Sequence, residues 1–216
     1  MHGITWEIAR GEQWLIEGPN GSGKSTLARL VAGEIAPAVG AHVERFGERG
    51  PFNVWELKRR IAPLSDALQQ GYDFEVSVRA TIASGFWSSV GLFHEPDAAQ
   101  WAAVDATIER LGLEPLAHRI FQRLSFGERR KVLIGRALVC MPDIIILDEV
   151  FNGLDAAFRR RFNDLLDRFT AAGGTCIVIA HHQEDVPAFV THRLSLRAGR
   201  IVSLGEAVLP MDLGHE

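Results

Sequence analysis

The sequence lacks the features that mark several broad classes of protein. It has only two cysteines, Cys140 and Cys176, and both lie in or beside apolar segments. We therefore expect two buried thiols, although the sequence alone leaves a disulfide or a reactive pair open. The apolar runs at residues 144–147 and 176–180 are far too short to cross a bilayer. No charged-then-apolar leader opens the chain, which argues against secretion and favours a cytoplasmic protein.

An excess of positive charge is also missing. The chain carries 27 acidic side chains against 23 lysines and arginines, for a net charge of −4. This balance gives no electrostatic basis for general binding to nucleic acids or to anionic membranes. The basic run at residues 159–161 lies on an expected helix whose other face is apolar, so a solvated helix face explains it better than a nucleic-acid contact does.

The chain also has no internal repeat and no low-complexity linker. Its 216 residues, 47% of them hydrophobic, are enough for one substantial domain or two small ones. Continuous apolar runs separated by helical patterns predict an α/β fold with a parallel sheet. Residues 76–139 are mostly helical and would form an insertion in one α/β domain. We further expect a half-buried strand at 4–8, a strand at 60–64, a helix with an apolar face at 158–169, and a hairpin at 194–202.

What is present is a glycine-rich loop with the sequence GPNGSGKST. It fits the phosphate-binding pattern G-x-x-x-x-G-K-[ST], with an apolar strand before it and helical spacing after it. Glycines allow successive backbone N–H groups to wrap a phosphate, Lys24 would reach the β- and γ-phosphates, and the Ser25 hydroxyl would bind Mg²⁺. The alternative is a glycine-rich turn with a surface lysine, but the four fixed positions coincide by chance in only about 1% of chains this long. The predicted nucleotide-binding residues are Gly18, Pro19, Asn20, Gly21, Ser22, Gly23, Lys24, Ser25 and Thr26.

A second acidic motif follows a buried strand. Residues 144–149 read IIILDE, and the carboxyl end of a parallel strand is where α/β sheets bind ligands. Asp148 there can hold Mg²⁺, and Glu149 can accept a proton from water attacking the γ-phosphate. A strand ending in a solvated acidic turn would look the same, but the phosphate loop in the same chain favours the catalytic interpretation.

The segment LSFGERRK at residues 124–131 predicts the start of a helix. Ser125 as N-cap with Glu128 three residues later is a capping box. The free N–H groups of such a helix start also suit an anion.

Taken together, these motifs resemble the nucleotide-binding domain of ABC-type ATPases over essentially the whole chain, residues 1–216. They follow the family's order: the phosphate loop, a helical insertion, LSFGE at 124–128, IIILDE at 144–149, NGLD at 152–155 and IAHH at 179–182. The aromatic residue in the signature and the run HHQED at 181–185 are similar to the ModF-like, or photorepair (PhrA-like), ATPases of molybdate-uptake loci. The resemblance implies a P-loop NTPase fold with a mainly parallel sheet, a small antiparallel β region and a helical subdomain at about 76–139.

The resemblance also implies roles for individual residues. The signature that would act on a second copy is Ser125, Phe126, Gly127 and Glu128, of which Ser125 and Gly127 would contact the γ-phosphate bound there. The loop that would cross the dimer seam is Asn152, Gly153, Leu154 and Asp155. His181 matches the switch histidine that would act with Glu149 and Lys24 in catalysis, although a lone histidine after a strand is usually only a polar strand end. We assign no role to His182.

Two positions depart from the family's pattern. Asp66 stands where the family has a magnesium-sensing glutamine; it could still bind Mg²⁺, but coupling to a transport partner is in doubt. The family's adenine-stacking aromatic lies well before the phosphate loop, and only 17 residues precede Gly18 here. We expect Trp6 and Trp14 to be core residues instead, with the start truncated or the adenine site weakened.

The functional expectation is an ATP hydrolase that uses ATP and Mg²⁺ and pairs head to tail with a second ABC domain, in a homodimer or a tandem protein. The first hypothesis for its role is that it energises a transporter of a molybdate-like anion or a metal ion. It would then have a separate membrane permease as partner and lie on the inner face of the membrane. The alternative is a regulatory or DNA-repair-linked ATPase without a membrane partner. The signature argues against a small-molecule kinase.

Overall fold

The computed structural model describes residues 1–49, 52–65, 75–151, 153–180 and 186–207. Its main element is a six-stranded sheet with the order β4-β5-β6-β1-β7-β8, in which only β8 runs antiparallel to its neighbour. The strands are β1 Gln13–Glu17, β4 Ile61–Leu64, β5 Ile144–Asp148, β6 Thr175–Ile179, β7 His192–Arg197 and β8 Arg200–Glu206. A separate antiparallel ribbon joins β2 Glu44–Arg45 to β3 Glu48–Arg49. The predicted α/β fold with a mainly parallel sheet and a small antiparallel region is confirmed.

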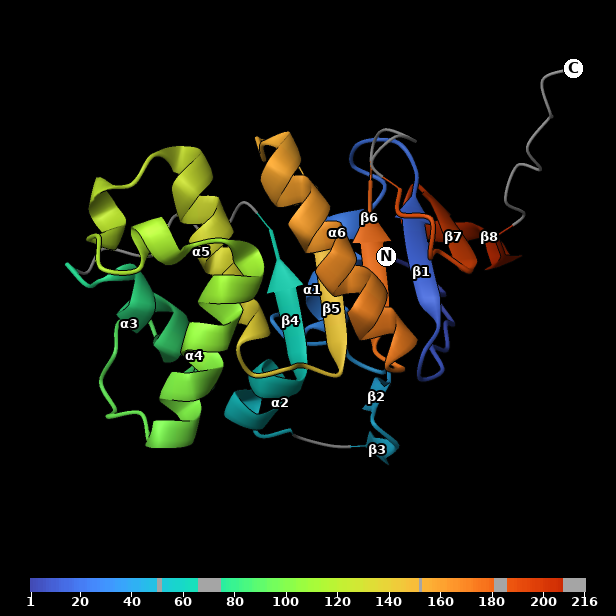
Figure 1. Cartoon of the computed structure of the whole chain (residues 1–216). Coiled ribbons are helices and arrows are strands. Elements are labelled where there is room, and N and C mark those ends of the chain that lie inside the picture. Colours follow the sequence, from blue (N-terminus) through green and yellow to red (C-terminus); the bar gives the residue numbers. More distant parts are fainter. Residues whose placement is uncertain (50–51, 66–74, 152, 181–185, 208–216) are drawn as a thin grey trace, which may run out of the picture.

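The four neighbouring strands β4, β5, β6 and β1 are largely apolar and buried, because helices cover both faces of this part of the sheet. Successive side chains alternate between two cores: Leu15 belongs to one, and its neighbours Trp14 and Ile16 belong to the other. Helices α1 (Lys24–Val31) and α2 (Val54–Arg60) pack on one face, and α6 (Ala156–Ala171) covers the other, in front of the sheet in Figure 1. The apolar face expected at 158–169 is therefore the buried side of α6.

A group of helices lies beside β4 (Figure 1). Its α-helices are α3 Val78–Ala83, α4 Ala98–Leu111 and α5 Phe126–Leu138, and its short 3₁₀ helices are η2 Ser84–Trp87, η3 Glu114–Leu116 and η4 Phe121–Arg123. Helix α5 connects the group to the sheet because it contacts β4. Gly85 permits a close approach to this helix, since a Cβ there would lie 2.1 Å from the Arg136 carbonyl oxygen.

The strand expected at residues 4–8 is absent from the described part of the chain, and that prediction is wrong. The alternation itself is real, because Ile4, Trp6 and Ile8 are partly buried and pack on the core of Trp14 and Ile16. No ladder can form beside β1, since β6 and β7 already pair with its two edges. The Trp6 ring meets the Trp14 ring edge to face at 5.3 Å, and its Nε1 has no hydrogen-bond partner among the described residues. Both tryptophans are thus core residues, as expected.

The two cysteines are free thiols, as expected. Cys176 is fully buried, and burial raises its pKa well above the ordinary value. Burial also raises the pKa of Cys140 to about 11. Neither thiol is therefore prepared to react as a thiolate near neutral pH.

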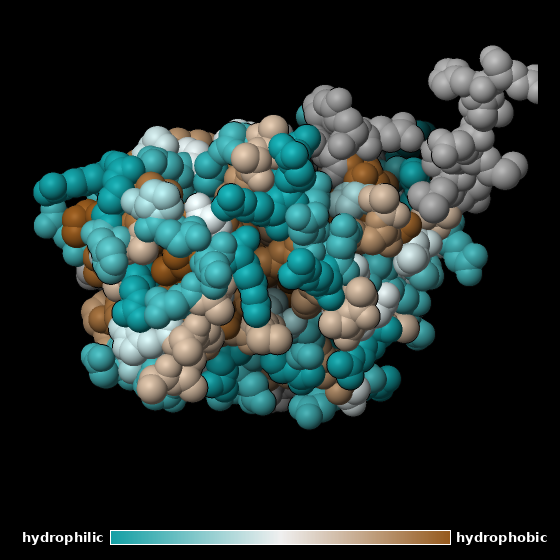
Figure 2. All heavy atoms as spheres, viewed as in Figure 1, coloured by the Kyte–Doolittle hydropathy of each residue, from teal (hydrophilic) through white to brown (hydrophobic). Residues whose placement is uncertain are grey.

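Hydrophilic side chains cover most of the face that carries α6, with smaller apolar areas between them (Figure 2). Arg160 and Arg161 are exposed on α6, which fits the solvated helix face expected for residues 159–161. Of the helices in the described ranges, none combines the length and the apolar character needed to cross a bilayer.

Candidate nucleotide-binding site

The glycine-rich loop joins the carboxyl end of β1 to the start of α1, as its sequence predicts. Gly18, Gly21 and Gly23 have φ angles of 144°, 75° and 105°, a region that favours glycine. A Cβ at Gly18 would lie 2.2 Å from the Leu196 carbonyl oxygen, so this position accepts no side chain. Gly23 is the N-cap of α1 and provides no side-chain cap. The first N–H groups of α1 are therefore available to an anion.

Lys24 lies over this loop and not out in solvent. It is 6% exposed, and its Nζ donates to the carbonyl oxygens of Gly18 at 2.8 Å and Pro19 at 3.2 Å. The Ser22 hydroxyl is buried and has no hydrogen-bond partner among the described residues. An ammonium group, an unpartnered hydroxyl and an uncapped helix start are all groups that a phosphate can satisfy. The exposed residues of the loop and of the first helical turn are Pro19, Asn20, Gly21, Ser25 and Thr26.

The acidic pair lies at the same edge of the sheet. Strands β5, β6 and β1 are parallel neighbours, so the residues after their carboxyl ends meet there. Asp148 ends β5, and Glu149 follows with a left-handed φ of 54°. The Glu149 N–H donates to the Ile179 carbonyl oxygen of β6 at 3.2 Å. Both acids are half-buried, and their carboxylate oxygens are of the kind that Mg²⁺ prefers.

The capping box predicted at the start of α5 is present. The Glu128 N–H donates to the Ser125 hydroxyl at 3.3 Å, and the Glu128 carboxylate accepts from the Ser125 N–H at 2.8 Å. Hydrogen bonds from the Ser125 backbone and hydroxyl, together with the nearby Arg119 guanidinium at 2.9 Å, lower the pKa of Glu128. Phe126, the first residue of the helix, is 63% exposed.

The loop that follows Glu149 packs against the first turns of α5. A Cβ at Gly127 would lie 3.3 Å from the Gly153 carbonyl oxygen, so the two backbones approach closely. Asp155 caps α6 by accepting from the Phe158 N–H at 2.9 Å, and Lys131 of α5 donates to the same carboxylate. The Lys131 contact, followed by the Phe158 N–H, lowers the pKa of Asp155. Asp155 thus has a structural task within this copy, in addition to the predicted role at a dimer seam.

One residue near the site was not singled out from the sequence. Arg130 of α5 is 5% exposed, and its guanidinium donates to the backbone carbonyls of Glu149 and Val150. The available signal was its spacing: Arg130 stands four residues before Ile134, so it falls on the buried side of the helix.

The structure brings the phosphate loop, Asp148 and Glu149 to one edge of the sheet. Three other expected site residues, namely Asp66, Asn152 and His181, lie outside the described residues, as does His182, which has no assigned role. The catalytic and metal-binding roles assigned from the sequence stay predictions.

Comparison with known proteins places this geometry in a family. The model of the ABC transporter family matches residues 1–152. The ABC transporter ATP-binding protein ModF of Escherichia coli is 36% identical over 198 residues, which are 90% of this chain but only 40% of ModF. The zinc uptake system ATP-binding protein ZurA of Listeria monocytogenes is 30% identical over 209 residues, covering 96% of this chain and 80% of ZurA.

Solved structures of ABC proteins also match this chain. The protein cbiO1 of Clostridium perfringens, part of the ABC transporter complex cbiONQ, matches with a TM-score of 0.75 and 28% identity over 94% of this chain and 80% of that one. A dimeric ATP-binding cassette in a post-hydrolysis state with ADP and Pi matches with a TM-score of 0.77 over 93% of this chain and 88% of that one. At 21% identity, this second likeness concerns the fold alone.

Proposed function

Because this chain belongs to the ABC transporter family of ATP-binding proteins and is an ABC-type ATPase domain, we propose that it hydrolyses ATP as one half of a head-to-tail pair. Each nucleotide would lie between the phosphate loop of one domain and the signature, Ser125 to Glu128, of the other. The observation that carries the proposal is the phosphate cradle, which combines three left-handed glycines, the uncapped start of α1 and the unpartnered Ser22 hydroxyl. We propose one nucleotide-binding domain over residues 1–216, with a helical subdomain at about 76–139.

The residues at this edge of the sheet would have different roles in ATP hydrolysis. Lys24 would exchange the two loop carbonyls that it now contacts for oxygens of the β- and γ-phosphates. Glu149 would accept the proton of the attacking water, with His181 orienting that water. Mg²⁺, when held by Ser25 and Asp148, would neutralise charge on the phosphates, and Asp66 would add a further contact. These groups act by positioning and by electrostatic stabilisation of the transferred phosphoryl group.

The second domain would complete the site. The Ser125 hydroxyl and the Gly127 backbone stand at the start of α5, where free N–H groups favour an anion. Phe126 beside them is a large exposed apolar side chain, which fits a surface that another molecule covers. Gly153 lies against this helix start, and the predicted loop 152–155 would lie at the same seam. The second domain would be a second copy or a tandem neighbour, and this chain spans 40% of ModF.

For the biological role, the names of the relatives favour transport. ModF is named an ABC transporter ATP-binding protein, and ZurA belongs to a zinc uptake system. The domain would accordingly energise uptake of a molybdate-like anion or a metal ion, in the cytoplasm at the inner face of the membrane, with a separate permease. Asp66 in place of the coupling glutamine favours the second candidate, a regulatory or DNA-repair-linked switch, and DNA-stimulated ATPase activity would distinguish the two.

The test uses the variant Glu149→Gln, with Glu48→Gln at an exposed carboxylate of β3 as the matched control. Loss of the general base should lower the ATPase rate about 10²–10⁴-fold, and trapped ATP should double the light-scattering mass only when Mg-ATP is present. The control should hydrolyse ATP at the wild-type rate and show no ATP-dependent doubling. A wild-type rate in Glu149→Gln would overturn the base assignment, and a monomer with and without Mg-ATP would overturn the pairing.

A further inference from the structure

Arg130 is an uncommon kind of buried charge. It is 5% exposed, yet its guanidinium donates to backbone carbonyls of the following loop: Nη2 to Glu149 at 2.7 Å and Nε to Val150 at 3.0 Å. Burying a guanidinium costs free energy unless its donors are satisfied, so these bonds hold Arg130 firmly in one position. The arrangement connects α5 directly to the turn that carries the proposed base.

The turn that Arg130 contacts is a strained one. Glu149 has a φ of 54°, a left-handed conformation that costs a residue with a side chain about 1–3 kcal/mol. Such a conformation persists only when its surroundings determine it. Here both flanking peptide groups are held: the Glu149 N–H by the Ile179 carbonyl oxygen of β6, and the Glu149 carbonyl by Arg130. Because the backbone on both sides sets the direction of the Cα–Cβ bond, Arg130 helps to determine where the carboxylate points.

Arg130 is also placed to transmit movement. It lies in the same helix as Ser125 and Gly127, which would contact the nucleotide held by a second domain. Other contacts between α5 and the loop, from Gly127 to Gly153 and from Lys131 to Asp155, lie farther along the loop. Of these contacts, the one from Arg130 reaches Glu149 itself.

We propose that Arg130 is a positioning residue for the ATPase reaction. It orients the Glu149 carboxylate toward the attacking water and couples this orientation to the position of α5, the helix that begins in the signature. This inference rests on the proposed function, because it needs Glu149 to be the base. Arg130 would act through the backbone of Glu149 and not by binding the nucleotide itself. A shift of α5 on docking of the second domain would move the Glu149 carbonyl with it.

The experiment is a double-mutant cycle between Arg130→Met and Glu149→Gln. Methionine keeps an unbranched apolar stem and removes both donors, and Arg110→Met on the exposed side of α4 is the matched control. A misplacement of about 1 Å costs about 10²-fold in rate, so Arg130→Met should lower kcat about 10–100-fold. The KM for ATP should stay unchanged, Glu149→Gln should still double in mass with Mg-ATP when Arg130→Met is added, and Arg130→Lys should recover part of kcat. The control should leave kcat unchanged.

The decisive measurement is the rate in the Glu149→Gln background. If Arg130 acts through Glu149, adding Arg130→Met to Glu149→Gln should leave the small residual rate within about twofold, because the cycle is then non-additive. An equal fall in both backgrounds, or a raised KM with unchanged kcat, would overturn the positioning role while leaving the base assignment intact. A wild-type rate for Glu149→Gln alone would overturn both. If Arg130→Met does not fold, Arg130→Lys runs the same cycle.

Discussion

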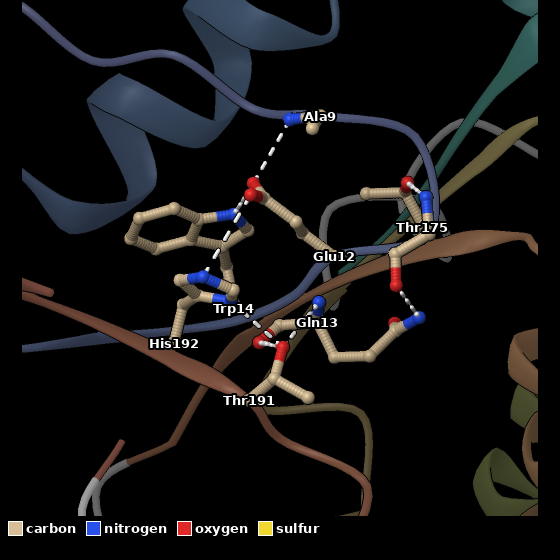
Figure 3. Close-up of polar contacts among 8 residues, drawn as sticks. Ala9, Glu12, Gln13, Trp14, Thr175, Thr191 and His192 are labelled. Atoms are coloured by element: carbon tan, nitrogen blue, oxygen red, sulfur yellow. Dashed lines mark hydrogen bonds and ion pairs between the residues drawn. The ribbon is translucent and has the colours of Figure 1, made fainter. Parts of the chain in front are cut away.

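Polar side chains at the start of strand β1 differ from those in the loop just beyond its carboxyl end. At the amino end, the side chains of Glu12 and Gln13 bond to the protein itself (Figure 3). Gln13 is 4% exposed; its Nε2 donates to the carbonyls of Gly11 at 2.9 Å and Gly174 at 2.8 Å, and its Oε1 accepts from the Cys176 N–H at 2.8 Å. This side chain joins β1 to β6, and both N–H donors of its amide are used within the protein.

Glu12 has a similar arrangement around an aromatic pair. Its Oε2 accepts from the Ala9 N–H at 2.8 Å and from the Trp14 Nε1–H at 2.9 Å. The His192 ring stacks on Trp14 at 4.7 Å, its Nε2 lies 3.7 Å from Glu12 Oε1, and its Nδ1 is 2.8 Å from the Thr191 hydroxyl (Figure 3). A carboxylate, an imidazole and a hydroxyl in one cluster suggest catalysis at first sight, but the carboxylate's partners are backbone and indole N–H groups.

The loop and helix start just beyond the carboxyl end of β1 have polar groups that the protein itself does not fully satisfy. Ser22 has a buried hydroxyl with no partner in the described chain, and the start of α1 has no side-chain cap. Lys24 contacts carbonyls of its own exposed loop, which water or a ligand can replace. The lesson is that satisfied polar groups contribute stability, whereas unsatisfied groups gathered at one place indicate a ligand.

The largest effect should come from Lys24→Ala. Without the ammonium group, the transition-state charge on the phosphates loses a preorganised partner, so the ATPase rate should fall at least about 10²-fold. The free energy of unfolding without nucleotide should change by less than about 1 kcal/mol, because the freed carbonyls lie in an exposed loop that water can reach. Denaturant unfolding and steady-state ATPase assays measure the two quantities. A large loss of stability would remove the contrast between the two ends.

Gln13→Leu should show the opposite pattern. It keeps the approximate volume but leaves the buried Cys176 N–H and the Gly174 carbonyl without their partner. At about 1–3 kcal/mol for each unsatisfied buried group, we expect a loss of about 2–4 kcal/mol in the free energy of unfolding. The ATPase rate per folded molecule should stay within about twofold of wild type, and Asn163→Leu on the exposed side of α6 should change neither quantity much. A fall in rate as large as that of Lys24→Ala would show that the amino end takes part in the reaction.

The smallest effect should come from Glu12→Ala. Glu12 is half-buried, and water can replace it at the exposed Ala9 N–H, so the loss should be about 1 kcal/mol in the free energy of unfolding, with the ATPase rate unchanged. Glu7→Ala, an exposed glutamate in the same segment, should cost less. A tenfold loss of rate in Glu12→Ala would identify the cluster of Glu12, Trp14 and His192 as functional after all.

Much of this arrangement could be predicted from local sequence, because its causes are local. The glycines around Lys24 favour left-handed backbone, Ser125 and Glu128 cap each other across three residues, and the apolar run that ends at Asp148 is typical of a buried strand. Each of these patterns acts within one turn or one strand. The segment at 4–8 shows the limit of such reasoning: its alternation correctly indicated a buried side, yet strand pairing depends on a free sheet edge.

The sequence by itself therefore determined the phosphate loop, the acidic pair after β5 and the start of the signature helix. Only the tertiary structure decided that the Ser22 hydroxyl has no partner in the described chain and that Lys24 bonds to carbonyls of its own loop, and so separated this loop from the equally polar cluster at the other end of β1. It also decided that Arg130 reaches Glu149, a contact between residues 19 positions apart. The physical reason is that a hydrogen bond depends on what lies within about 3 Å, and for buried groups those neighbours come from distant parts of the chain.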